Sequence, residues 1–257
     1  MKLIGVDIGG SHISAAQVVL RDENTIFHNF HEAQVNTFGE QNDIISAWSK
    51  VILKASGHSK DIQVGIAMPG PFNYKEGISL IKDQGKMASL YQTSVKGLLA
   101  ESLEISSSHL EFTNDAEAFL AGESYAGAGI KFQNSIGITL GTGFGSAIKV
   151  HDVVKDAKLW TAPFRDGIAE DFLGTAWFVK SNQIFETFGR ALGEFLFPYL
   201  IRLHSEGVVL GGKISLASDK YLLTTNSYLK TMGYSVPIVV SKLEERSSLI
   251  GACLPFI

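Results

Sequence analysis

The chain has a single cysteine, and this scarcity excludes two kinds of structure. Of its 257 residues only Cys253 carries a thiol, so no disulfide can form within the chain and no zinc site can be built from cysteines. Such a composition fits a reducing compartment. The opening stretch MKLIGVDIGG has an apolar run too short for a signal peptide, and we therefore expect a cytoplasmic protein.

Long apolar runs and basic clusters are also missing. No stretch of about 18 apolar residues is present, so no membrane-spanning helix is expected. The formal net charge is −4, and no Lys/Arg cluster of the kind that binds nucleic acid stands out. The seven histidines show no paired spacing suited to a metal. We therefore expect neither a membrane nor a nucleic acid as partner.

Two similar segments, one in each half of the chain, dominate the strand pattern. LIGVDIGGSHISAAQVV and SIGITLGTGFGSAIKV each read as an apolar strand, a glycine turn and a second strand. We interpret them as a duplicated unit, with an N-terminal lobe over residues 1–120 and a C-terminal lobe over residues 121–257. The closing helical stretch RSSLIGACL can return to the N-terminal lobe. Helical spacing in NDIISAWSKVILKAS predicts a helix capped by Asn42 or Asp43.

The first glycine turn, in DIGGSH, is a candidate phosphate site. Gly9 and Gly10 lack side chains, so backbone N–H groups there can approach an anion closely. Ser11 adds a hydroxyl donor, and Asp7 can hold Mg²⁺ directly or through water. A tight hairpin without a ligand explains this one turn about equally well.

The second turn, in LGTGFG, follows the same logic. Gly141 and Gly143 flank the hydroxyl donor Thr142, and two such turns could hold a polyphosphate from both sides. Neither is a P-loop, since no Gly-Lys-Ser/Thr follows, and neither is a dinucleotide fingerprint, since each leads into a strand. A third turn, Gly211 and Gly212 in VVLGGKIS, could let adenine or ribose lie against the backbone, although a strand-to-helix turn explains it better when taken alone.

Acidic residues begin two predicted helices. In FTNDAEAFLAGE, Asp115 is either an N-cap or a carboxylate that takes the proton from an attacking hydroxyl. The capping and catalytic roles of Asp115 can coexist. Asn114 would bind a neighbouring hydroxyl as donor and acceptor. In GIAEDFLGTA, Glu170 and Asp171 open another helix, where acidic residues are favoured with or without a substrate.

Taken in order, these features resemble the ROK family of sugar kinases, within the actin-like and hexokinase-like ATPase superfamily. Each matching piece is weak alone, but six in order from Gly5 to Cys253 are a specific signal. The pieces are GVDIGGSHISAA, VGIAMPGPFNYKEGI, FTNDAEAFLAGE, ITLGTGFGSAI, GIAEDFLGTA, and VVLGGKIS with SSLIGACL.

The resemblance implies an α/β fold of two ribonuclease-H-like lobes, each a mixed sheet flanked by helices, with sugar and ATP meeting in the cleft between them. It implies Asp115 as the catalytic base, and Asn114, Glu170 and Gly70 as contacts to the sugar. The other implied ligands are ATP and Mg²⁺. Their contacts are Gly9, Gly10 and Ser11 at one end of the triphosphate, Gly141, Thr142 and Gly143 at the other, Gly211 and Gly212 at the adenosine, and Asp7 near the metal.

One segment departs from the family pattern. Many members have a Glu-x-Gly-His stretch and a cysteine-rich zinc motif, whose His and Glu also contact the sugar. The corresponding stretch here, AKLWTAPFRDGIAEDFLG, has neither cysteine nor histidine, so no structural zinc is expected. Trp160, Arg165 or Asp166 could take over part of the site, which leaves the identity of the sugar open.

The activity indicated is ATP-dependent phosphorylation of a hexose hydroxyl, with glucose the expected acceptor. Polyphosphate is an alternative donor, used by some zinc-free relatives, although no dense Lys/Arg run supports it here. A second alternative is a non-catalytic sugar sensor. The DNA-binding members carry an extra segment before the first glycine turn, and a first strand from residue 3 is expected to leave it no room. Another actin-like protein, such as a chaperone or an acetate-kinase-type enzyme, fits the short chain less well. Many relatives dimerise, so a homodimer is one option.

Overall fold

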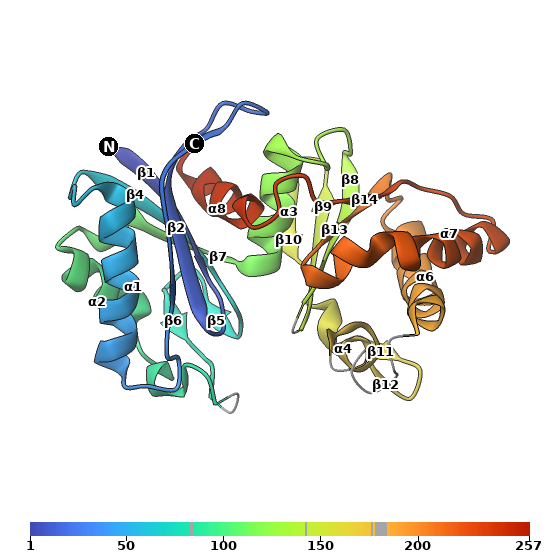
Figure 1. Cartoon of the computed structure of the whole chain (residues 1–257), viewed down its shortest axis with the longest axis horizontal. Helices are drawn as coiled ribbons and strands as arrows, with labels where there is room; N and C mark the ends of the chain where they lie inside the picture. Colours follow the sequence, from blue (N-terminus) through green and yellow to red (C-terminus); the bar gives the residue numbers. More distant parts are fainter. Residues whose placement is uncertain (83–84, 142, 176, 178–183) are drawn as a thin grey trace. The chain divides into compact units, whose positions relative to one another are not determined.

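The computed structural model describes residues 1–82, 85–141, 143–175, 177 and 184–257, and the chain divides into two compact units. Unit 1 comprises Met1–Ala118 and Ser248–Ile257, and unit 2 comprises Phe119–Ser247. The chain passes from unit 1 to unit 2 within helix α3 (Asp115–Ala126) and returns within helix α8 (Arg246–Cys253), both labelled in Figure 1. Unit 1 is therefore built from two separate stretches of sequence.

Unit 1 is organised around a five-stranded mixed sheet in the order β3-β2-β1-β4-β7. β1, β2 and β3 pair antiparallel, whereas β1, β4 and β7 run parallel. The carboxyl ends of those three parallel strands therefore meet at one edge of the sheet. The strands are β1 (Lys2–Ile8), β2 (His12–Val19), β3 (Ile26–Gln34), β4 (Ile62–Met68) and β7 (Leu110–Asn114).

One face of this sheet is covered by α1 (Gln41–Ser56) and α2 (Val95–Leu103) (Figure 1). Alternate strand residues such as Ile4 and Val64 point into this core, as strand geometry requires. The cap predicted for α1 is wrong. The helix already begins at Gln41, after an N-cap at Glu40 whose side chain makes no capping bond. The apolar periodicity starts only at Ile44, so the polar first turn gave no periodic signal.

The opposite face is covered by α8 so closely that side chains would not fit between. A Cβ on Gly65 of β4 would overlap the carbonyl oxygen of Ala252, and one on Gly5 of β1 would overlap that of Leu249. A small cluster of alanines, Ala67, Ala118 and Ala252, fills the remaining space. Glycine and alanine at these positions are therefore what lets the helix backbone lie on the sheet.

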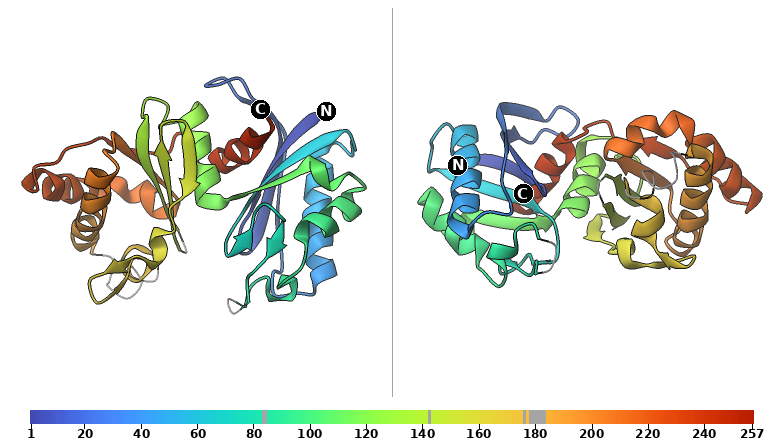
Figure 2. Two further views of the ribbon diagram at one scale, coloured as in Figure 1. Left: turned by 180° about the vertical axis from the view of Figure 1, so that it is seen from behind. Right: turned by 60° about the horizontal axis from the view of Figure 1, so that its bottom comes forward.

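Unit 2 repeats the topology in the order β10-β9-β8-β13-β14, with β8, β13 and β14 parallel. The helices α6 (Phe185–Arg202) and α7 (Leu222–Thr231), orange in Figures 1 and 2, cover one face. Residues 119–126 of α3 lie on the other, where Phe119 packs on Gly211. The strands are β8 (Asn134–Leu140), β9 (Phe144–Val150), β10 (Val153–Asp156), β13 (Gly207–Gly211) and β14 (Ile238–Val240).

The predicted class, an α/β fold with mixed sheets flanked by helices, is confirmed, and each predicted glycine-turn hairpin is present as β1–β2 and β8–β9. Among the described residues no helix combines the length and apolarity needed to cross a membrane. Short elements complete the fold. They are β5 (Phe72–Asn73), β6 (Ile78–Ser79), β11 (Pro163–Phe164), β12 (Gly167–Ile168), α4 (Ala169–Leu173), and the 3₁₀ helices η1 (Ala88–Leu90), η2 (Ser107–His109), η3 (Leu159–Thr161), η4 (Lys213–Lys220) and η5 (Leu254–Phe256).

Glu123 of α3 is fully buried and ties this helix to the segment that follows β14. Its Oε1 accepts hydrogen bonds from Ser241 Oγ at 2.5 Å and from the Leu243 N–H at 3.0 Å. Its Oε2 accepts from the Ala128 N–H at 2.7 Å. The carboxylate thus meets donors on both oxygens, and these hydrogen bonds compensate for its burial.

Glu123→Gln is expected to lower the free energy of unfolding by about 2 kcal/mol, because the amide turns a donor toward N–H groups that then lose their acceptor. Urea denaturation followed by circular dichroism measures this. Glu101→Gln, an exposed site on α2, is the matched control and should leave the midpoint unchanged. Equal midpoints for the two variants would show that the bonds to Glu123 contribute nothing to stability.

Candidate active site

The carboxyl-terminal edge of the unit 1 sheet carries the residues predicted from the first half of the chain. Asp7 lies near the end of β1, in register with Ala67 of β4, which is in turn in register with Thr113 of β7. Only one strand therefore separates Asp7 from the strand that ends at Asn114. Ligands of open α/β sheets bind outside the carboxyl ends of parallel strands, so this edge is the candidate site in unit 1.

The first glycine turn is held by backbone bonds on both sides. The Gly9 N–H donates to the His12 carbonyl at 2.9 Å, and the Gly10 carbonyl accepts from Thr37 Oγ1 at 2.6 Å. The Ser11 carbonyl accepts from the Val35 N–H at 2.9 Å. Because the carbonyls of Gly10 and Ser11 are turned toward neighbouring segments, the conformation of the turn is fixed before any ligand arrives.

A cation that the sequence did not reveal stands beside this turn. A Cβ built on Gly10 would lie 3.0 Å from Nζ of Lys86, so the ammonium group touches the space above the glycine. The segment that carries it is anchored by the Met87 N–H, which donates to the Thr37 carbonyl at 2.6 Å. A lone lysine in a loop has no spacing that marks it as a ligand contact, and only the tertiary structure brings it to the turn.

The question raised by the Asn-Asp pair is answered in part: the cap of α3 is Asn114. Its Oδ1 accepts from the N–H groups of Ala116 at 3.0 Å and Glu117 at 3.1 Å. Asp115 is the first helical residue, half-buried, and its Oδ1 accepts from the Ala116 N–H at 2.9 Å. The capping role weighed for Asp115 therefore falls to its neighbour, while the catalytic role stays a prediction.

Tyr74 lies between two predicted sugar contacts, Gly70 and Asn114. Its hydroxyl accepts from Asn114 Nδ2 at 3.0 Å and donates to the Met68 carbonyl at 3.2 Å. A Cβ on Gly70 would lie 3.3 Å from the same hydroxyl. Sequence reasoning missed this tyrosine, because an aromatic residue in a short turn is common and carries no motif.

In unit 2 the segment GIAEDFLGT packs against the second glycine turn. Glu170 Oε1 accepts from the Phe144 N–H at 3.4 Å and lies 2.7 Å from the position of a Cβ on Gly143. The Thr175 N–H donates to the Gly141 carbonyl at 3.2 Å, and the Thr175 hydroxyl also donates to that carbonyl. Thr142 lies outside the described residues. The carboxylate of Glu170 is thus at the turn itself, and its predicted contact with a sugar stays a prediction.

The neighbouring acidic and cationic groups have structural partners. Asp171 Oδ2 accepts from the Ile168 N–H at 3.0 Å, a bond that caps α4. Arg165 donates to Glu194 of α6 at 2.7 Å and stacks on the ring of Phe164. Trp160 and Asp166, also considered as replacements for the zinc segment, are exposed.

The third glycine turn lies at the same edge of the unit 2 sheet as the second. Gly211 ends β13 in register with Thr139 of β8, and Gly212 adopts φ +80°, where a Cβ would overlap the Leu140 carbonyl. The Gly212 carbonyl accepts from Ser215 Oγ at 2.7 Å. Only glycine meets both requirements at position 212. The glycines predicted from the second half of the chain are therefore brought together in unit 2.

The donor set in unit 1 fits a magnesium ion of the kind that accompanies nucleotides. Such an ion is bound through one or two carboxylates, with substrate phosphates and water as its other ligands. Asp7 beside the first glycine turn offers one carboxylate, and among the described residues no cluster of three or more His, Cys, Asp or Glu could hold a metal by itself. Burial raises the pKa of the Cys253 thiol and of the Tyr221 phenol, so both stay protonated and neither is a nucleophile.

The chain resembles known proteins in both its sequence and its fold. Residues 3–160 match the family model described as ROK family. A glucokinase from Thermotoga maritima is 28% identical over 151 residues, which span 59% of this chain and 45% of the glucokinase. The match thus covers less than half of that protein's length.

Solved structures resemble the chain over nearly all of its length. The inorganic polyphosphate/ATP-glucomannokinase from Arthrobacter sp. strain KM superposes with a TM-score of 0.80 and 23% identity, over 99% of this chain and 97% of that one. A ROK family glucokinase from Streptomyces griseus, in complex with glucose and AMPPNP, gives a TM-score of 0.80 and 19% identity, over 99% of both chains. At these identities the likeness establishes the fold.

Proposed function

Since this chain belongs to the ROK family, we propose that it is a sugar kinase that transfers the γ-phosphoryl group of ATP to a hydroxyl of a hexose, with glucose as the acceptor. The observation that carries the proposal is the sheet edge of unit 1, which brings Asp7, a glycine turn and the start of α3 to the ends of neighbouring parallel strands. The compartment proposed is the cytoplasm, where ATP is made and a lone cysteine stays reduced.

In the proposed reaction Asp115 is the general base. Its carboxylate accepts the proton of the sugar hydroxyl while the hydroxyl oxygen forms a bond to the γ-phosphorus. The bond from the γ-phosphorus to the β–γ bridging oxygen breaks, and ADP leaves with the electron pair. Because Asn114 caps the helix, the Asp115 carboxylate is not required for the first turn of α3 to form.

The phosphates of the donor would be held mainly by backbone. In unit 1, Gly10 and Ser11 offer N–H groups and Ser11 also a hydroxyl, whereas the Gly9 N–H already donates to the His12 carbonyl within the turn. In unit 2, the turns at Gly141 and Gly211 remain predicted contacts of the donor. Asp7 would hold a magnesium ion, which would neutralise charge that builds between the phosphates. The backbone N–H groups of the turns are dipoles held in fixed positions. They stabilise the transition state because they need no reorganisation when charge moves.

A coupled assay of ADP release tests the proposal. The full chain is mixed with ATP and Mg²⁺ and with glucose, mannose, fructose, N-acetylglucosamine or N-acetylmannosamine in turn. We expect turnover with glucose. Turnover with another hexose only would correct the acceptor, and turnover only when inorganic polyphosphate replaces ATP would correct the donor. No turnover with any pair, together with calorimetric binding of a sugar, would support the non-catalytic sensor instead.

Lys86→Met is expected to raise the KM for ATP about tenfold while the KM for the sugar changes little, because one charge-assisted phosphate contact is lost near Gly10. Steady-state kinetics with each substrate varied in turn measures this. Lys82→Met is the matched control, since Lys82 is close to Lys86 in the sequence but lies over the ring of Tyr91. An unchanged KM for ATP in Lys86→Met would remove this lysine from the phosphate site.

A further inference from the structure

We infer that Tyr74 is a positioning residue that fixes the Asn114 amide as a hydrogen-bond donor toward the acceptor sugar. The inference rests on the proposed function and concerns the same sheet edge. Its starting point is the short chain of hydrogen bonds that runs from Asn114 Nδ2 to the Tyr74 hydroxyl, and from there to the Met68 carbonyl at the end of β4.

The hydrogen bonds of the Asn114 side chain leave it only one way to bind a ligand, as a donor. Its amide oxygen has two lone pairs, and both are directed to backbone N–H groups of α3. One N–H of the amide nitrogen goes to Tyr74, and among the described residues the other has no acceptor, so it is available to a ligand. Asn114 therefore recognises a sugar hydroxyl by donating to it, and the expectation that it would both donate and accept is revised.

Tyr74 sets which way the amide faces. The helix N–H groups require the oxygen of Asn114 on their side, and the phenol oxygen accepts a hydrogen bond on the other side. The same phenol approaches the position of a Cβ on Gly70 to 3.3 Å, so it also lies beside the Pro-Gly-Pro turn. A change at Tyr74 would therefore affect how the acceptor sugar is held.

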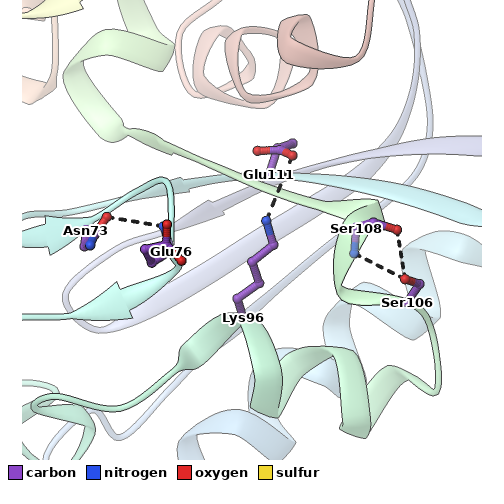
Figure 3. Close-up of polar contacts among 6 residues, drawn as sticks. All are labelled: Asn73, Glu76, Lys96, Ser106, Ser108 and Glu111. Atoms are coloured by element: carbon purple, nitrogen blue, oxygen red, sulfur yellow. Dashed lines mark hydrogen bonds and ion pairs between the residues drawn. The ribbon is translucent and has the colours of Figure 1, made fainter.

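The hairpin that carries Tyr74 is well anchored, as a positioning role requires. In the turn between β5 and β6, Asn73 Oδ1 accepts from the Glu76 N–H at 3.2 Å, a bond drawn in Figure 3. The Gly77 N–H donates to the Asn73 carbonyl at 2.8 Å. The ring of Tyr74 packs on Phe72, with centroids 5.3 Å apart, and the side chain of Phe72 is buried.

The far end of the hairpin is fixed to the strand that ends at Asn114. The Lys96 N–H of α2 donates to the Gly77 carbonyl at 3.1 Å. The Lys96 ammonium in turn lies 4.0 Å from Glu111 Oε1 on β7, and Figure 3 shows this side chain reaching from α2 to the strand. Tyr74 and Asn114 are thus held by one connected framework within unit 1, and the hydrogen bond between them joins two supported groups.

Tyr74→Phe tests the inference. We expect the KM for the sugar to rise about fivefold, the equivalent of one hydrogen bond, with the KM for ATP unchanged. Asn114→Asp is a second variant. An aspartate carboxylate caps a helix about as effectively as the asparagine amide does, but it offers no N–H to the sugar. We expect it to melt within a few degrees of the parent and to lose sugar affinity more severely than Tyr74→Phe.

Tyr91→Phe is the matched control, because Tyr91 is exposed and its hydroxyl has no part in the proposed site. If Tyr74 had only a structural role, Tyr74→Phe would have a lower melting temperature but the same KM values for sugar and ATP as the parent. That result would overturn the inference. A parent that turns over no sugar and binds none by calorimetry would refute the proposed function. An active parent whose kinetics are unaltered by Tyr74→Phe would refute only the inference.

Discussion

Asp115→Asn is expected to lower kcat by a factor of about 10²–10⁴ while the affinity for the sugar stays within a few-fold of the parent. The amide cannot accept the proton of the attacking hydroxyl, but it keeps the size of the side chain. Its oxygen can still accept from the Ala116 N–H, and Asn114 still caps the helix. The fold should therefore be unaffected, and the loss should fall on the chemical step.

Two measurements together decide this prediction. Single-turnover assays give the rate of phosphoryl transfer, and isothermal titration calorimetry gives the affinity for the sugar. Asp43→Asn, which changes a carboxylate in the first turn of α1, is the matched control and should keep the parent rate. Retention of the parental rate by Asp115→Asn would show that the carboxylate is not the base and would leave Asp115 as an ordinary residue of the first helical turn.

Gly65→Ala is expected to lower the free energy of unfolding by more than about 3 kcal/mol, the range of severe overpacking. The added methyl group would overlap the Ala252 carbonyl, which is part of a helix backbone and has no rotamer with which to move aside. Relief would require α8 to leave the sheet of unit 1, together with its contacts to Ala67 and Ala118.

Urea denaturation and the yield of folded protein measure this effect. Gly141→Ala is the control, since a Cβ there would find no heavy atom of the described residues within 4 Å. Its unfolding midpoint should stay close to that of the parent, even though the turn belongs to the candidate site. If Gly65→Ala were as stable as Gly141→Ala, the close seating of α8 on β4 would be wrong.

The sequence predicted the parts of the fold that depend on local pattern. Apolar runs broken by glycine pairs gave both hairpins, because strand period and turn chemistry are properties of neighbouring residues. The cap of α1 was placed incorrectly, since its polar first turn carries no periodicity. At α3 the pattern offered Asp115 as the cap, and the hydrogen bonds place the cap one residue earlier, at Asn114.

The candidate site was less accessible to sequence reasoning where its residues meet only through tertiary structure. Lys86 reaches Gly10, and Tyr74 reaches Asn114, across loops whose paths no local pattern fixes. Glu170 was expected at the sugar from the resemblance to the ROK family, and its carboxylate accepts a hydrogen bond at the second glycine turn. Contacts of this kind depend on the path of a loop in the folded protein, and the local sequence pattern does not specify that path.

The split of unit 1 between two stretches of sequence has a consequence for the order in which the protein is synthesised. Residues 248–257 follow the whole of unit 2 in the chain, so the ribosome completes unit 2 before it delivers α8. Domains generally fold as units as they emerge during translation. Here β1 and β4 are synthesised first, and α8, which packs on Gly5 and Gly65, is not available until unit 2 has been synthesised. A nascent chain stalled before residue 248 would therefore carry a folded second unit and an unfinished first one.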